Sequence, residues 1–156
     1  MIVTNSDLFL KKIAQIPGYY ERENSFTLET PTKIKTPSKI IFSIGNNGYV
    51  GNSIKKIDLN EKLNWVSGEE NRTDADYRNG IDFYIYAERI DLVNFSYKFS
   101  SQADLDKRTY TKIARFYCAS TKEANDAVKK GDIVAETLRD KKDDLEYVKK
   151  ELEFLN

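Results

Sequence analysis

Alternation of apolar and polar residues marks the middle of the chain as strand-rich. Residues 92–99 place apolar side chains at every second position, from Val93 to Phe99, which is the pattern of a half-buried antiparallel strand. Residues 109–119 fit a strand or a helix, and their content of Tyr, Thr, Ile and Phe favours a strand. Further strands are predicted by β-branched and aromatic residues at 19–30, 39–44, 49–57 and 81–88.

Turn and loop residues divide these strands. Asn46-Asn47-Gly48 tolerates positive φ and predicts the turn of a hairpin between residues 39–44 and 49–57. Residues 30–38 contain two prolines, so we expect an exposed loop or an edge there and exclude a central strand. Residues 69–80 predict a polar loop because they are almost entirely charged or polar.

Helical signals occur at both ends of the chain and at two places between. A short N-terminal helix is expected from Ser6 until Pro17-Gly18 ends it. Asp58 with Glu61, and Ser120 with Glu123, have the spacing of a capping box, which marks a helix N-terminus. We therefore expect helices over residues 59–67 and from residue 120 to the glycine at 131.

The C-terminal residues 132–156 contain the clearest helical pattern of the sequence. Leucines recur at heptad spacing from Leu138 to Leu152, so pairing with a second copy as a homodimer is the alternative to docking on the sheet. Tyr84 and Tyr86 share the face of a strand opposite its apolar side chains. We expect the C-terminal helix to cover these two tyrosines as a second layer.

These elements predict an α+β fold in a single domain. The length of 156 residues suits one domain, with a mixed body over residues 1–131 and a C-terminal helix over residues 132–156. The expected architecture is an N-terminal helix, an antiparallel β-sheet of about five or six strands, and C-terminal helices packed on the sheet.

Composition excludes much catalytic and metal chemistry. The chain has no histidine and one cysteine, Cys118, which removes histidine-based triads, histidine-ligated zinc and internal disulfides. We therefore predict no catalytic residues, no metal ligands and no cofactor. No apolar run is long enough to span a membrane, and the N-terminus lacks the pattern of a signal peptide. With an unpaired cysteine, these features favour a cytoplasmic protein.

Charge is balanced overall but uneven along the chain. The 25 basic and 25 acidic residues cancel, yet residues 30–57 contain five lysines and no acid. A local excess of lysine on a hairpin attracts phosphates or an acidic protein surface, and glycines let a backbone approach an anion closely. The predicted binding residues are Lys33, Lys35, Lys39, Asn46, Asn47, Tyr49, Lys55 and Lys56.

Tyr49-Val50-Gly51-Asn52-Ser53 resembles the second half of the motif of GIY-YIG nucleases. The resemblance covers these five residues, and residues 40–42 lack the glycine and tyrosine of the first half. It implies a metal-dependent phosphodiesterase in which Tyr49 is the motif tyrosine and Glu88 a metal ligand.

Three functional hypotheses follow from these observations. The first is a non-catalytic binding protein that occupies a surface of a macromolecular partner, as an inhibitor, immunity or mobile-element accessory protein does. Its ten tyrosines suit a protein–protein contact. The alternative is a nucleic-acid-binding protein that uses the basic hairpin of residues 33–56. The further alternative is the degenerate GIY-YIG-like phosphodiesterase.

Overall fold

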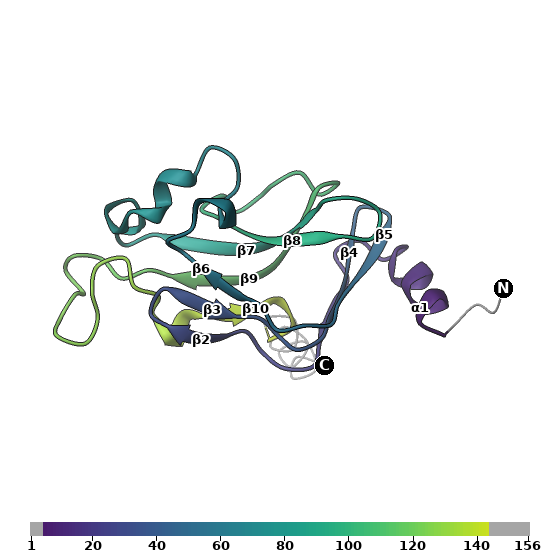
Figure 1. The fold of residues 1–156 in the computed structure, drawn as a ribbon, viewed down its shortest axis with the longest axis horizontal. Coiled ribbons are helices and arrows are strands. Elements are labelled where there is room, and N and C mark those ends of the chain that lie inside the picture. The colour runs from purple at the N-terminus through teal and green to yellow at the C-terminus, as the bar shows by residue number, and fades with distance from the viewer. Residues whose placement is uncertain (1–4, 144–156) are drawn as a thin grey trace, which may run out of the picture.

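Residues 5–143, which the computed structural model describes, form three small antiparallel sheets flanked by short helices (Figure 1). Sheet A has the strand order β1 (Tyr20–Arg22), β4 (Ile40–Ile44), β5 (Asn47–Gly51). Sheet B has the order β2 (Thr27–Thr30), β3 (Lys33–Lys35), β6 (Lys56–Asp58). Sheet C has the order β10 (Arg139–Asp140), β9 (Tyr110–Tyr117), β7 (Asp82–Arg89), β8 (Phe95–Ser100). The helices are α1 (Asn5–Ile13) and the 3₁₀ turns η1 (Lys62–Asn64), η2 (Glu70–Thr73), η3 (Ala75–Arg78) and η4 (Ala135–Thr137).

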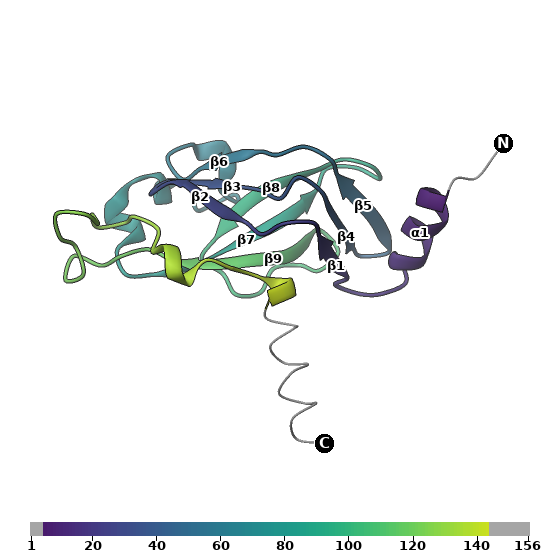
Figure 2. The same ribbon diagram turned by 90° about the horizontal axis from the view of Figure 1, so that it is seen from below.

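One apolar core joins the three sheets. Phe42 of sheet A packs edge-on against Phe95 of sheet C, with ring centroids 4.7 Å apart. Trp65 lies 5.4 Å from the ring of Phe83 and donates its indole N–H to the carbonyl of Leu59 at 2.8 Å. Burial of such large aromatic side chains is the main stabilising term in a core of this kind. Figures 1 and 2 place α1 at one end of the long axis and the loop of residues 120–131 at the other.

The predicted α+β class is confirmed, and several strands lie where the pattern placed them. The strands β4 and β9 fall within the predicted stretches, β7 and β8 each end one residue beyond theirs, and β5 begins two residues before its predicted start. The expected single sheet of five or six strands is wrong, because the strands divide among three sheets. The N-terminal helix is present as α1. Among residues 5–143, no helix is long and apolar enough to cross a membrane.

The loop predicted over residues 30–38 is wrong at its centre. Residues 33–35 form β3, the middle strand of sheet B, and pair with β2 and β6 on its two sides. Pro31 and Pro37 flank this short strand and so remove no hydrogen bond from the ladder. Ile34 is fully buried and pairs with Ile57 across the sheet. The burial of Ile34 between the two prolines therefore accounts for a central strand at this position.

The hairpin of β4 and β5 turns one residue earlier than the sequence predicts. Ile44 pairs with Asn47, which leaves Gly45 and Asn46 as a two-residue loop. Gly45 has φ +58°, as the first central residue of a type II′ turn requires. The predicted return strand of residues 49–57 also divides, because β5 ends at Gly51 and β6 joins sheet B.

The predicted helices after residues 58 and 120 are wrong. Residues 59–67 contain a single 3₁₀ turn, η1, followed by Trp65, whose backbone is extended and whose side chain is buried. Ser120 and Glu123 do exchange the two hydrogen bonds of a capping box, at 3.1 and 3.3 Å. The chain then bends back, and Ala119 exchanges backbone hydrogen bonds with Gly131 and Asp132. Tertiary pairing overrides the local helix signal here.

The helix predicted from Asp132 is wrong over its first part. Residues 132–140 contain the 3₁₀ turn η4 and the strand β10, which pairs with β9 through Arg139 and Arg115. Residues 141–143 are helical. Residues 144–156, and with them most of the predicted heptad pattern and its homodimer interface, lie outside the described residues.

Candidate anion-binding pocket

The face of sheet C that points away from the core carries tyrosines and basic side chains. Phe83, Ile85 and Ala87 of β7 lie in the core and are fully buried. The intervening Tyr84 and Tyr86 point the other way because side chains alternate along a strand. The strand register places Tyr84 opposite Arg115, Tyr86 opposite Lys112 and Glu88 opposite Tyr110.

Three tyrosine rings line up along this face. The ring centroids of Tyr84 and Tyr86 are 6.3 Å apart, and those of Tyr86 and Tyr110 are 5.9 Å apart. Burial raises the pKa of Tyr110 to about 12, with a further contribution from its hydrogen bond to Glu88. The phenol therefore stays neutral near pH 7 and does not repel an anion. The ammonium of Lys112 lies 4.5 Å from the centroid of Tyr84, which is a cation–π contact.

A loop, not the C-terminal helix, covers Tyr86 in the described part of the chain. Tyr86 is 2% exposed and donates its hydroxyl hydrogen to the carbonyl of Gln102 at 2.6 Å. Residues 101–109 pass over this part of the sheet between β8 and β9. The loop forms one wall of a pocket whose floor includes Tyr86 and Tyr110.

This pocket has a volume of about 630 Å³ and is unusually rich in positive charge. Its apolar walls include Pro17, Leu105 and Tyr110, and Asn46 lies at its edge. Asp104 is the single carboxylate among the lining residues. Five basic residues line it, namely Lys107, Arg108, Lys112, Arg115 and Lys141. Arg108 is paired with Asp106 at 3.1 Å, and the remaining excess of positive charge in the lining favours an anionic ligand.

The basic groups of the pocket are close enough to repel one another. Burial lowers the pKa of Lys141, and the positive charges of Lys107 and Lys112 lower it further. The ammonium of Lys141 donates to the carbonyl of Gly18, so it is held at the pocket wall. An anion bound between these ammonium groups would replace repulsion by attraction. Gathered like charges with a perturbed pKa are typical of a binding site.

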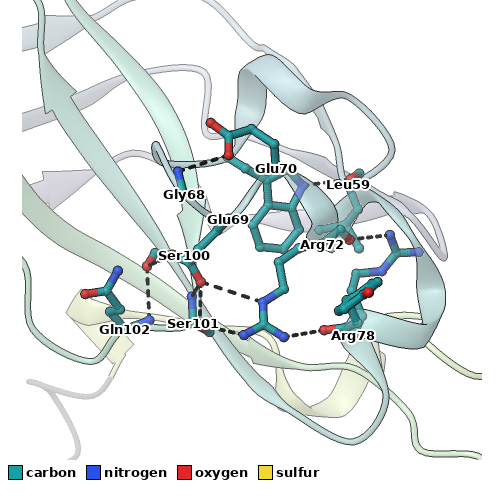
Figure 3. A network of polar contacts seen from close by, with 11 residues as sticks. Leu59, Gly68, Glu69, Glu70, Arg72, Arg78, Ser100, Ser101 and Gln102 are labelled. Atoms are coloured by element: carbon teal, nitrogen blue, oxygen red, sulfur yellow. Dashed lines mark hydrogen bonds and ion pairs between the residues drawn. The ribbon is translucent and has the colours of Figure 1, made fainter.

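A network of polar contacts anchors the loop that forms the pocket wall (Figure 3). Glu69 accepts hydrogen bonds from the hydroxyl of Ser100 at 2.5 Å and from the backbone N–H of Ser101 at 2.8 Å. Burial alone would raise the pKa of Glu69, but these hydrogen bonds reverse the shift and hold the pKa below its ordinary value. Ser100 in turn accepts from the N–H of Gln102 at 3.0 Å. The network fixes the carbonyl that receives the Tyr86 hydroxyl.

The predicted lysines lie on another surface, the outer face of sheet B. Lys33, Lys35 and Lys56 alternate with the buried Ile34 and Ile57, so they point away from the core.

Neighbouring strands supply the acids that the segment of residues 30–57 lacks. Glu29 forms an ion pair with Lys56 at 2.8 Å, and Asp58 lies opposite Lys33. Lys39 and Lys55 are exposed in the segments flanking these strands. The structure thus brings three of the predicted lysines together, but among counter-charges.

Asn46, Asn47 and Tyr49 lie away from those lysines, on the β4–β5 hairpin. Asn46 borders the candidate pocket. Tyr49 is 1% exposed, stacks on Phe42 with ring centroids 5.7 Å apart, and donates its hydroxyl to the carbonyl of Asp91 at 2.8 Å. A ring buried in this way offers no surface to a phosphodiester or a protein partner. Within residues 5–143, no three Cys, Asp or Glu side chains are close enough to share a metal ion.

The basic residues of the pocket are hidden when charge is counted over a long stretch of sequence. Residues 93–156 contain 13 basic and 12 acidic residues, which masks a shorter run. Residues 107–119 contain four basic residues and no acid. That run carries four of the five basic groups of the pocket. Charge counted over residues 107–119 alone therefore reveals these four residues. Lys141 lies far from them in sequence and joins them only in the folded chain.

No family model, curated protein or solved structure matches this chain. Its class is therefore defined by the fold and the pocket themselves. It is an α+β protein of three small sheets with a tyrosine-floored, cation-lined pocket on the outer face of sheet C.

Proposed function

We propose that this protein is a non-catalytic binding protein whose pocket on sheet C holds a nucleoside phosphate, as a unit of a single-stranded nucleic acid. The observation that carries the proposal is the set of five basic residues around a pocket with one carboxylate and a tyrosine wall. Basic groups bind phosphates, and aromatic side chains bind unstacked bases. Duplex DNA would hide its bases from such a pocket.

The size and lining of the pocket support this ligand. A volume of about 630 Å³ lies in the range of small-ligand pockets and suits one or two nucleotide units. Lys107, Lys112 and Lys141 would contact phosphate, because all three line the pocket. The ring of Tyr110 and the side chains of Leu105 and Pro17 offer apolar area to a base.

The lining favours binding over turnover. Thr111 donates its hydroxyl to the carbonyl of Ser43 at 2.5 Å, so it is already engaged as a structural hydrogen bond. The nearby Glu69 is saturated with hydrogen-bond donors, which makes it a poor general base. Asp104 has no second carboxylate beside it in the lining to share a metal ion.

The test measures the affinity of fluorescently labelled oligonucleotides by anisotropy at several salt concentrations. The probes are a single-stranded oligothymidylate, an oligouridylate and a duplex, with free nucleoside triphosphate as a competitor. Three phosphate contacts predict a slope of log affinity against log salt near −2, which is about an 18-fold loss between 50 and 200 mM salt. Lys107→Gln should reduce that loss to about 7-fold by removing one contact.

Lys35→Gln is the matched control, because Lys35 is exposed on sheet B and lies outside the pocket. We expect it to leave affinity and salt slope unchanged. Weakening by Lys35→Gln but not by Lys107→Gln would move the site to sheet B. Binding of the free triphosphate alone would identify a nucleotide-binding protein. Absence of any binding at low salt would refute the proposal, and cleavage of the probes would refute its non-catalytic part.

A further inference from the structure

A second hollow lies where the end strands of all three sheets meet. It has a volume of about 430 Å³ and is lined by residues of β5, β6 and β8. Among residues 5–143, each of these strands is the last in its sheet and pairs with one neighbouring strand. The end of a sheet exposes backbone N–H and C=O groups that can pair with another extended segment. We call this hollow the edge groove.

The backbone of β8 points hydrogen-bonding groups into the edge groove. At one end of this edge, the N–H of Val66 already donates to the carbonyl of Phe99 at 3.1 Å. Backbone groups of residues two apart along a strand point to the same side, so those of Tyr97 and Phe95 also point away from β7. Both residues line the edge groove. Within residues 5–143, the chain itself thus occupies the first position of this edge, and no backbone hydrogen bond occupies the next two.

The rim of the edge groove carries large apolar side chains that face solvent. Val93, which is 76% exposed, lines the groove. Leu63 and Leu92 are 82% and 64% exposed, and each is next in sequence to a lining residue. Ile54 lies between two lining residues and is also exposed. Exposed apolar side chains from separate loops at one groove mark a protein contact surface.

The polar groups of the edge groove indicate the charge of its ligand. Its described lining contains Lys55 and Lys56 and no carboxylate. Glu29 pairs with Lys56, whereas Lys55 forms no ion pair among the described residues. The buried hydroxyl of Ser96, also in the lining, has no hydrogen-bond partner in the structure. Lys55, which has no ion pair within residues 5–143, therefore favours a ligand that brings a negative group.

We propose that the edge groove binds an extended segment of a partner protein, which adds a strand to β8 and carries apolar side chains next to an acidic one. Open strand edges supply the affinity through backbone hydrogen bonds, and side-chain subsites supply the choice of sequence. This surface is separate from the pocket on sheet C, since the two share no lining residue. The inference therefore goes beyond the proposed function and does not depend on it.

The test uses a panel of short synthetic peptides in which valine or isoleucine alternates with aspartate or glutamate. Matched peptides carry lysine in place of the acids, or proline in place of the central apolar residue. We expect the acidic peptides to bind and to slow hydrogen exchange at the amides of Phe95 and Tyr97. The lysine and proline versions should bind at least about tenfold more weakly, because they lose the charge match or the strand pairing.

Two variants locate the contact. Val93→Asp places a charge in the edge groove and should weaken acidic-peptide binding at least about tenfold. Ile90→Asp is the control, because Ile90 is 57% exposed on the same β7–β8 connection but does not line the groove. Ile90→Asp should leave the affinity within about twofold of the original.

Three results would overturn the inference. The first is no binding by any acidic peptide, and the second is protection of amides elsewhere than on β8. The third is self-association in sedimentation experiments that Val93→Asp abolishes, since a second copy of this chain would then occupy the edge groove.

Discussion

The strongest test of the fold concerns the ion pair that holds residues 139–143 against β1, beside the pocket. Arg22 of β1 contacts the carboxylate of Asp140 at 2.5 Å and also pairs with Asp143. The side chain of Asp140 is completely buried, and that of Arg22 is 11% exposed. Asp140 immediately precedes Lys141 of the pocket. We predict that Arg22→Met strongly destabilises the protein.

The magnitude follows from the burial of the partner that remains. Loss of one member of a buried ion pair leaves the other charge uncompensated and costs about 3–5 kcal/mol. A protein of this size has a free energy of unfolding of about 5–15 kcal/mol, so the loss is a large fraction of the total. The matched control is Lys142→Met, which breaks an exposed ion pair with Glu21 at 3.2 Å between the same two segments. Such exposed pairs contribute about 0–1 kcal/mol.

The pH dependence separates this explanation from a simple loss of packing. Burial raises the pKa of Asp140, and Arg22 opposes the rise. Without Arg22 the folded-state pKa rises further above the unfolded value, so the folded protein binds a proton more readily. The destabilisation by Arg22→Met should therefore be greatest near neutral pH and should decrease as the pH falls and Asp140 becomes protonated.

Urea unfolding at pH 7.5 and pH 5, followed by circular dichroism, measures both effects. Adding Asp140→Asn to Arg22→Met should recover much of the stability at pH 7.5, because the buried charge is then gone. A loss below about 1 kcal/mol at neutral pH, the size of an exposed pair, would refute the reasoning. So would a loss that is equal at the two pH values.

Three further predictions concern single residues. Gly131→Ala should lower the melting temperature far more than Gly68→Ala. Both glycines have positive φ, but a Cβ added at Gly131 would lie 2.9 Å from Ala75, whereas a Cβ added at Gly68 would face open space. Burial raises the pKa of Cys118 to about 12, so iodoacetamide should alkylate the native thiol at least about a hundredfold more slowly than in urea, as mass spectrometry would show. Glu69 has a lowered pKa, so its hydrogen bonds should contribute about 1.5–3 kcal/mol to the free energy of unfolding at pH 7, and this contribution should be lost as the pH falls through that pKa. The free energy of unfolding of Glu69→Gln should change less over the same pH range. Identical pH profiles for the two proteins would contradict this role of Glu69.

The strands were predictable wherever one strand face meets the core and the other meets solvent. Residues 81–88 and 92–99 alternate between the two strand faces with the period of a strand, and they became β7 and most of β8. That period is a local property and needs no knowledge of the partner strand. The division into three sheets was not predictable in this way. Nothing between residues 51 and 56 signals that the chain leaves sheet A and joins sheet B.

The helix errors share one physical cause. A capping box indicates that a chain can satisfy its own backbone N–H groups locally, and Ser120 and Glu123 do form those hydrogen bonds. It carries no information about the residues beyond the first turn, and here Ile133 donates its N–H to the carbonyl of Pro31 in a distant segment. Short helices are marginal without a packed apolar face. The backbone pairing of residues 119–133 therefore outweighs local propensity.

Charge counts along the sequence misplace a binding surface when counter-charges lie on neighbouring strands. Lys33 and Lys56 belong to an acid-free segment, yet Asp58 and Glu29 face them across sheet B. The pocket shows the opposite case, because Lys107 and Lys112 meet Lys141 only through the fold. Screening limits such interactions to about 8–10 Å, so the number of carboxylates within that distance decides whether lysines attract a ligand. The pocket lining contains five basic residues and one carboxylate, whereas two of the three lysines on sheet B face a carboxylate across it, and this difference supports the proposed anion site.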